Sequence, residues 1–392
     1  MKALRLLLTN LTVLVGLLFV ANLLSAVVLD GRRHLYKPLF TEPAQAPEDK
    51  RAALPVFAKA DTVKERFSEL FAMGFDYTPF VGWSRRPFQG AHTTIEESGD
   101  RIVPSAPRNP QGTIRFLGGS AMWGTGSNDS ETIPSLVAAE FPNHLVLNHA
   151  ESGFNSRQSL ARVINLANQG KALDLVISYD GVNDVSFQCT GVASINGHGR
   201  EQLIRDRIDR RLRLGPAPDS LQDVHLFRVL LASTYELVLN GYLTIFGQPV
   251  QPVEAGDTAA PGRQSLCAAD PTFATQVADT LIANWRIAKT VVEAEGGRFL
   301  AVLQPVAHLG TPDIDYLDAE GLRAYLKADF LAVYPLLIKQ IREERLDWVI
   351  DLTDVFDGGQ RVYIDDTHVT AEGNRMVAAR LKPVIASILG SD

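Results

Sequence analysis

From Thr113 to the C-terminus the chain alternates short apolar runs with longer stretches whose apolar residues recur at helical spacing. Short apolar runs separated by helices are typical of a parallel sheet that is covered on both faces. The runs predict strands at Thr113–Leu117, His144–Asn148, Leu173–Tyr179, Arg298–Leu303 and Trp348–Leu352. Helical spacing predicts helices at Glu131–Phe141, Ser156–Asn168, Pro271–Glu295, Ala319–Arg345 and Ala371–Leu389. The predicted fold class is therefore α/β.

Five parallel strands between helices fit a flavodoxin-like three-layer sandwich. A long insertion, 185–269, follows the third strand and is too long to be an ordinary connection in a compact domain. Within it, Leu226–Phe246 is apolar but contains Arg228 and Glu236, which argue against a membrane span. We expect this stretch to lie over the ligand crevice or against the membrane surface.

The first apolar stretch of the chain, Leu6–Leu29, has 24 residues without a charge. At about 1.5 Å per residue, a helix of this length crosses the roughly 30 Å hydrocarbon core of a bilayer. A cleaved signal peptide is the alternative, but its apolar region usually has about 7–15 residues. Residues 1–36 are therefore predicted to be a membrane anchor. Basic residues flank the stretch on both sides, so they do not decide its orientation.

Residues 37–112 are predicted to be a linker and an N-terminal extension of the domain at 113–392. Lys37–Pro55 is rich in proline and acidic residues, as expected of a tether, and Val56–Met73 has helical spacing. Phe75–Ile102 then gathers aromatic residues. We expect these to pack across the edge of the sheet, with a sugar-stacking platform as the alternative.

Composition narrows the class of protein. Of 392 residues, 46% are hydrophobic and 21% charged, which is typical of a globular chain, and a net charge of −7 argues against nucleic acid as a partner. The only two cysteines, Cys189 and Cys267, bracket the insertion. This arrangement is consistent with a disulfide in an oxidising compartment, whereas in a reducing cytosol they would be unrelated thiols. We expect the catalytic domain to lie outside the cytoplasm, in the periplasm.

Three short blocks carry the candidate chemistry. Thr113–Gly126 reads TIRFLGGSAMWGTG and puts Ser120 just after a strand, Tyr179–Asp184 reads YDGVND, and Tyr363–His368 reads YIDDTH. Together they resemble the SGNH hydrolases, also called the GDSL esterase family, over roughly residues 113–185 and 270–390. A GxSxG nucleophile elbow is excluded by Met122. No metal-binding or phosphate-binding motif is present, so no cofactor is expected.

Acyl transfer needs a nucleophile, a base, a group that orients the base, and donors for the oxyanion. Ser120 is the candidate nucleophile and His368 the candidate base, with Asp365 three residues before it. The adjacent Asp366 is expected to be exposed, although it could substitute for Asp365 if the register of the loop differs. These loops follow the first and last strands, which end at one edge of a parallel sheet.

The resemblance implies that the oxyanion donors are the backbone N–H groups of Ser120 and Gly153 and the side chain of Asn183, in the loop after the third strand. Asp184 is expected to brace that loop. The sequence departs from the family at Gly119, where many members have aspartate, and this weakens a lipase assignment more than an esterase one.

The sequence thus predicts a membrane-anchored serine esterase that acts on an O-acyl ester, such as acetyl, of an extracytoplasmic carbohydrate. The reaction would pass through an acyl-serine intermediate. Transfer of the acyl group to a glycan hydroxyl remains an alternative, because both nucleophiles can use His368 as base. A catalytically silent accessory subunit of an envelope assembly is the other alternative.

Overall fold

The computed structural model describes residues 2–31, 49–57, 62–205, 208, 234, 265–318 and 322–390. The chain divides into two compact units. One comprises Met1–Gln45 with Ile204–Glu254, and the other comprises Ala46–Leu203 with Ala255–Asp392. The second unit holds the candidate site.

In the first unit, helix α1 (Lys2–Gly31) contains the one stretch of the described chain, Arg5–Val28, that is long and apolar enough to cross a membrane. Two of its polar side chains contact Thr234. The backbone N–H of Thr234 donates to Asn22 Oδ1 at 3.1 Å, and Ser25 Oγ lies 3.4 Å from Thr234 Oγ1. Apart from Thr234, the predicted placement of Leu226–Phe246 lies outside the described residues.

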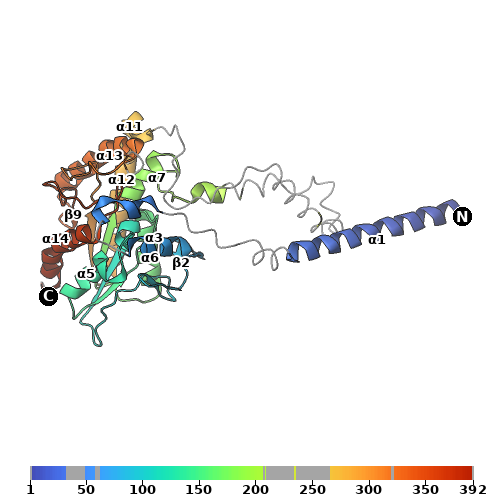
Figure 1. The fold of residues 1–392 in the computed structure, drawn as a ribbon, viewed down its shortest axis with the longest axis horizontal. Coiled ribbons are helices and arrows are strands. Elements are labelled where there is room, and N and C mark those ends of the chain that lie inside the picture. The colour runs from blue at the N-terminus through green and yellow to red at the C-terminus, as the bar shows by residue number, and fades with distance from the viewer. Residues whose placement is uncertain are drawn as a thin grey trace. The chain divides into compact units, whose positions relative to one another are not determined.

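The second unit is built on a five-stranded parallel sheet in the order β6-β5-β7-β8-β9 (Figure 1). The strands are β5 (Thr113–Gly118), β6 (Leu145–Asn148), β7 (Leu175–Asp180), β8 (Arg298–Leu303) and β9 (Val349–Asp351). Numbered along the chain this order is 2-1-3-4-5, which is the flavodoxin-like order. The predicted fold class is confirmed.

Helices cover both faces of the sheet (Figure 1). On one face lie α6 (Ser156–Asn168), α7 (Val182–Cys189), α12 (Pro271–Ala294) and α13 (Ala324–Glu343), which share one core cluster with the sheet. The other face carries α5 (Ile133–Glu140) and α14 (Ala371–Leu389), which share a second cluster. Each side of the sheet therefore has its own apolar core. The candidate functional residues lie between the two cores, at the carboxyl edge of the sheet.

Some element boundaries differ from the prediction. The helix predicted at Glu131–Phe141 is split into η4 (Asp129–Glu131) and α5, because the Thr132 side chain accepts from Ser135 N and caps a new helix there. The helix predicted from Ala319 begins at Ala324. In the N-terminal extension, the predicted helix Val56–Met73 is instead the short η3 (Pro55–Phe57) followed by α3 (Val63–Ala72).

The aromatic segment forms two hairpins. These pair β1 (Phe75–Thr78) with β2 (Gly82–Arg85), and β3 (Phe88–Gln89) with β4 (Thr94–Ile95). The backbone of Arg101 forms isolated antiparallel β-bridges with Ile95 and with Asn148. The second hairpin therefore lies at the β6 edge of the sheet. Trp83 is buried against Phe154, 5.5 Å between ring centroids. Tyr77 and Phe80, in contrast, are 76% and 93% exposed, so the segment is only partly packed.

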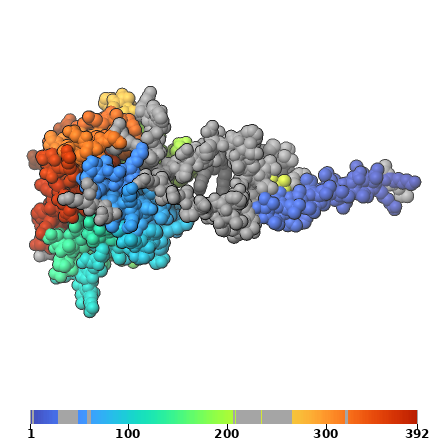
Figure 2. All heavy atoms as spheres, in the orientation of Figure 1, coloured from blue at the N-terminus to red at the C-terminus, as the bar shows by residue number. Residues whose placement is uncertain are grey.

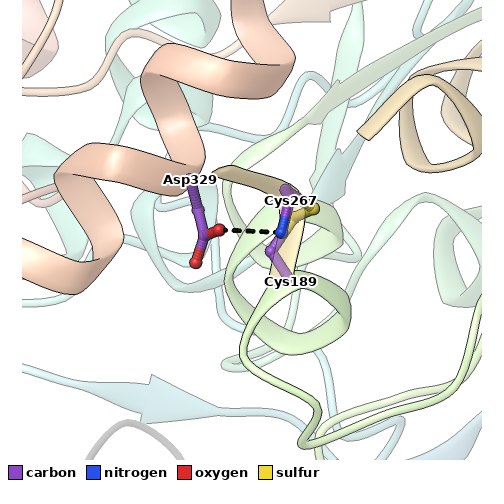
Figure 3. Close-up of side chains that lie close together, drawn as sticks. All are labelled: Cys189, Cys267 and Asp329. Atoms are coloured by element: carbon purple, nitrogen blue, oxygen red, sulfur yellow. Dashed lines mark hydrogen bonds between the residues drawn. A yellow bond between two sulfur atoms is a disulfide. The ribbon is translucent and has the colours of Figure 1, made fainter. Parts of the chain in front are cut away.

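The predicted disulfide is confirmed. Cys189, at the end of α7, is bonded to Cys267 in α11 (Leu266–Ala269), with Cα atoms 5.1 Å apart across 78 residues of sequence. Asp329 of α13 lies beside the bond and accepts from the backbone N–H of Cys267 at 3.2 Å (Figure 3). Because both sulfurs are used in the bond, this cluster offers no thiolate to a metal ion.

Candidate active site

Ser120 lies where β5 ends and the short helix α4 (Ser120–Trp123) begins. The turn between them depends on Gly118, which has φ +145 and whose added Cβ would lie 2.4 Å from the carbonyl oxygen of Tyr179. No residue with a side chain fits this position without moving the neighbouring strand. The turn therefore presents the Ser120 hydroxyl at the carboxyl edge of the sheet, where it is partly exposed.

His368 and Asp365 meet Ser120 at this edge, although 248 residues separate the serine from the histidine. Ser120 Oγ lies 2.7 Å from His368 Nε2, and His368 Nδ1 lies 2.7 Å from Asp365 Oδ2. The backbone N–H groups of Thr367 and His368 donate to Asp365 Oδ1 at 2.9 and 2.8 Å, so the carboxylate organises its own loop. The structure thus brings the three residues together in the order hydroxyl, imidazole, carboxylate.

Asp365 is held as a carboxylate. Burial by itself would raise the pKa of Asp365, but the neighbouring His368, Arg51 and Arg323 outweigh burial and hold that pKa well below its ordinary value. Arg51 Nη1 donates directly to Asp365 Oδ2 at 2.8 Å. Sequence reasoning missed Arg51, because it lies in the segment interpreted as a tether, where no periodicity or motif marks it.

Asp366 is wrongly predicted to be exposed. Its side chain is fully buried and bonds to His308 Nε2 at 2.5 Å and to Arg323 Nε at 2.6 Å. Successive side chains of this loop point in opposite directions. Asp365 therefore faces the side of Ser120, whereas Asp366 points away from it, into the interior of the unit. Asp366 therefore clamps the loop that carries His368 instead of substituting for Asp365.

Asn183 is predicted in a loop, but it lies in the first turn of α7. Gly181, with φ +121, ends β7 and lets the chain turn directly into the helix. The Asn183 side chain donates one amide hydrogen to the carbonyl oxygen of Phe154 at 2.7 Å. It also lies close to Gly119, since a Cβ added at Gly119 would be 2.4 Å from Asn183 Nδ2. Asn183 therefore stands beside the residue that precedes Ser120.

Gly153 is buried and has φ +81, in the turn that leads from β6 into α6. Two backbone hydrogen bonds tie this turn to the serine strand: His149 N donates to Phe116 O at 2.9 Å and Glu151 N to Gly118 O at 3.1 Å. The buried Glu151 also accepts from Arg85 Nε at 3.2 Å and from Ser152 N at 2.7 Å. The pair of Glu151 and Arg85 was not predicted from the sequence. A glutamate inside a buried block could have indicated it.

Asp184 stabilises the site by linking two of the helices that carry it. Its carboxyl accepts from Ser156 Oγ at 2.5 Å and from Ser156 N at 3.1 Å, which joins α7 to the start of α6. Burial, together with the neighbouring Asp180, raises the pKa of Asp184 to about 7. Asp180 is buried too and bonds to Ser178, Ser159 and Trp285. These contacts hold the turn that carries Gly153 and the first turn of α7, which carries Asn183.

No protein-family model matches the sequence, and no curated protein matches it. Solved structures do resemble it. A member of the lipolytic protein G-D-S-L family from Veillonella parvula is 13% identical, with a TM-score of 0.36 over 70% of this chain and 98% of that one. A carbohydrate acetylesterase family member from Sinorhizobium meliloti is 18% identical, with a TM-score of 0.34 over 71% of this chain and 100% of that one.

An acetyl xylan esterase is 12% identical, with a TM-score of 0.33 over 70% of this chain and 99% of that one. Identities and TM-scores this low say nothing about the substrate of this chain. The chemistry proposed below therefore rests on the geometry of Ser120, His368 and Asp365.

Proposed function

We propose that this chain is a serine esterase of the SGNH type that hydrolyses an O-acyl ester through an acyl-Ser120 intermediate. The observation that carries the proposal is the 2.7 Å contact between Ser120 Oγ and His368 Nε2, with Asp365 on the other ring nitrogen. A serine hydroxyl, a base within hydrogen-bond reach and a carboxylate that orients the base are the parts that acyl transfer requires.

In the proposed reaction Ser120 Oγ attacks the acyl carbon while His368 Nε2 takes the hydroxyl proton. Charge then develops on the carbonyl oxygen. We assign its stabilisation to the backbone N–H groups of Ser120 and Gly153 and to the second amide hydrogen of Asn183, since only the first is used by Phe154. Collapse breaks the ester C–O bond, and His368 gives its proton to the leaving oxygen, which departs as a hydroxyl group. Water, activated by the same base, then releases the acid.

We propose an acylated carbohydrate outside the cytoplasm, in the periplasm, as the substrate, with α1 as a single membrane anchor. The Cys189–Cys267 bond supports an oxidising compartment. Ser120, Asn183 and His368 are all partly exposed, so solvent reaches all three. Glycine at 119, which the sequence blocks share with polysaccharide-modifying members of the family, favours an esterase over a lipase.

The test is esterase activity of the full chain in detergent micelles, with p-nitrophenyl acetate and an acetylated polysaccharide as substrates. Ser120→Ala should reduce turnover by several orders of magnitude, because it removes the nucleophile. Ser130→Ala, at an exposed serine in η4, is the matched control and should retain activity. A fluorophosphonate probe should label Ser120 of the wild-type chain. A folded wild-type chain that neither turns over ester nor reacts with the probe would favour the silent accessory subunit.

A further inference from the structure

The guanidinium of Arg51 contacts the carboxylate that pairs with the imidazole of His368. Arg51 Nη1 is 2.8 Å from Asp365 Oδ2, and this is the same oxygen that lies 2.7 Å from His368 Nδ1. The two donors therefore converge on one carboxylate oxygen. Arg51 belongs to η2 (Lys50–Ala53), more than 300 residues before Asp365 in the sequence. The segment that carries it lies on the surface of the catalytic unit, blue in Figure 2, beside the red C-terminal part.

The guanidinium of Arg51 is fixed on three sides. Its Nε and Nη2 donate to the carboxylate of Asp49 at 3.0 and 2.6 Å, and its Cζ lies 4.8 Å from the centre of the Phe67 ring. Asp49 also caps the backbone of η2 by accepting from Arg51 N at 3.0 Å. A guanidinium that bridges two carboxylates through separate nitrogens is a rigid contact, which lysine cannot reproduce. The remaining nitrogen is thereby aimed at Asp365.

We propose that Arg51 is a positioning residue of this site: it holds Asp365 in the orientation that pairs with His368 and balances the charge of the carboxylate. The inference rests on the esterase function proposed above and extends the site to the segment that precedes the sheet. Its basis is the convergence of Arg51 and His368 on one oxygen, which leaves the carboxylate little freedom to rotate.

The charge of Arg51 has a direct consequence for the base. The charged groups that face Asp365 are His368, Arg51 and Arg323, and those that face Arg51 are Asp49 and Asp365. Arg323 is already paired with Asp366. If Arg51 were removed, the carboxylate would attract a proton on the imidazole more strongly, because the cation bonded directly to it would be gone. The imidazole would then stay protonated, and so unable to act as a base, up to a higher pH.

The experiment measures kcat and kcat/KM against pH for the full chain in detergent micelles with p-nitrophenyl acetate. Arg51→Gln should move the acid limb of the kcat/KM profile upward by about one pH unit, because it removes a positive charge that disfavours protonation of the nearby imidazole. It should also lower kcat about tenfold at the plateau, with KM little changed. Arg51→Lys, which keeps the charge but not the bridge, should lower kcat and leave the acid limb near its wild-type position.

Arg375→Gln is the matched control, because Arg375 forms an exposed ion pair with Glu372 on α14 and not with Asp365. Its pH profile should be that of the wild type. An Arg51→Gln variant with wild-type kcat and an unmoved acid limb would refute the role of Arg51 while leaving the esterase intact. An inert wild-type chain would instead refute the esterase function, and the role of Arg51 with it.

Discussion

Gly119→Ala is expected to disable the site without touching Ser120, His368 or Asp365. The backbone at Gly119 has φ −86 and ψ −159, which any residue adopts, so the substitution causes no backbone strain. The obstacle is space: the new Cβ would lie 2.4 Å from Asn183 Nδ2 and 3.1 Å from the carbonyl oxygen of Phe154. An ordinary contact needs at least 3.4 Å, so the Asn183 amide must move by about 1 Å.

That movement takes away one proposed oxyanion donor. Losing a single donor of this kind typically reduces kcat by about 10²–10³-fold, or about 3–4 kcal/mol of transition-state stabilisation. KM should change little, because the donor acts on charge that develops during the reaction. The assay is steady-state hydrolysis of p-nitrophenyl acetate by the full chain, with circular dichroism to establish that each variant is folded.

A double-mutant cycle with Asn183→Ala makes the reasoning refutable. Once the Asn183 amide has been removed, the Cβ at 119 meets only the 3.1 Å approach to Phe154, so the double variant should be no slower than Asn183→Ala alone. Gly112→Ala, where the nearest atom would be 3.6 Å away at the other end of β5, is the matched control and should keep full activity. Undiminished kcat in Gly119→Ala, or additive losses in the double variant, would refute the assignment of Asn183.

Replacing Cys189 and Cys267 together by serine should lower the free energy of unfolding by about 4 kcal/mol, because the bond closes a 78-residue loop in the unfolded chain; denaturant titration of the oxidised protein measures this, and an unshifted midpoint would contradict it. Asp184 retains its proton when folded up to pH about 7, whereas the unfolded chain releases it near 3.8, so its contribution to stability should fall as the pH rises between these values. Asp184→Asn should flatten this dependence, and equal pH profiles of stability in the two proteins would count against it.

The sheet could be predicted from the sequence because its strands are buried on both faces. All six residues of β5 and all six of β7 are buried, and most of them are apolar, although Arg115 and Asp180 are exceptions. The convergence of Ser120 with Asp365 and His368 was also predictable, since strands of a parallel sheet end at one edge. The pairing of the two cysteines could be predicted as well, as they are the only two.

Contacts that depend on the path of an irregular segment could not be predicted. The position of Arg51 beside Asp365 depends on how the residues around η2 cross the surface of the unit, and neither spacing nor composition encodes that path. The prediction that Asp366 is exposed was wrong for a related reason. Two adjacent carboxylates look equivalent in the sequence, and the hydrogen bonds of the folded loop decide which of them faces the imidazole.

The departure at Gly119 follows from the start of α7. Gly181 has φ +121, and a Cβ there would lie 3.0 Å from Leu303 Cδ1 and 3.1 Å from Tyr334 Oη, so the chain must turn into α7 immediately after β7. This tight turn puts Asn183 in the first turn of the helix and directs its amide at the residue before Ser120. An aspartate at 119 would need the space that Asn183 occupies. In this chain, the position of Asn183 leaves no room for a side chain at 119.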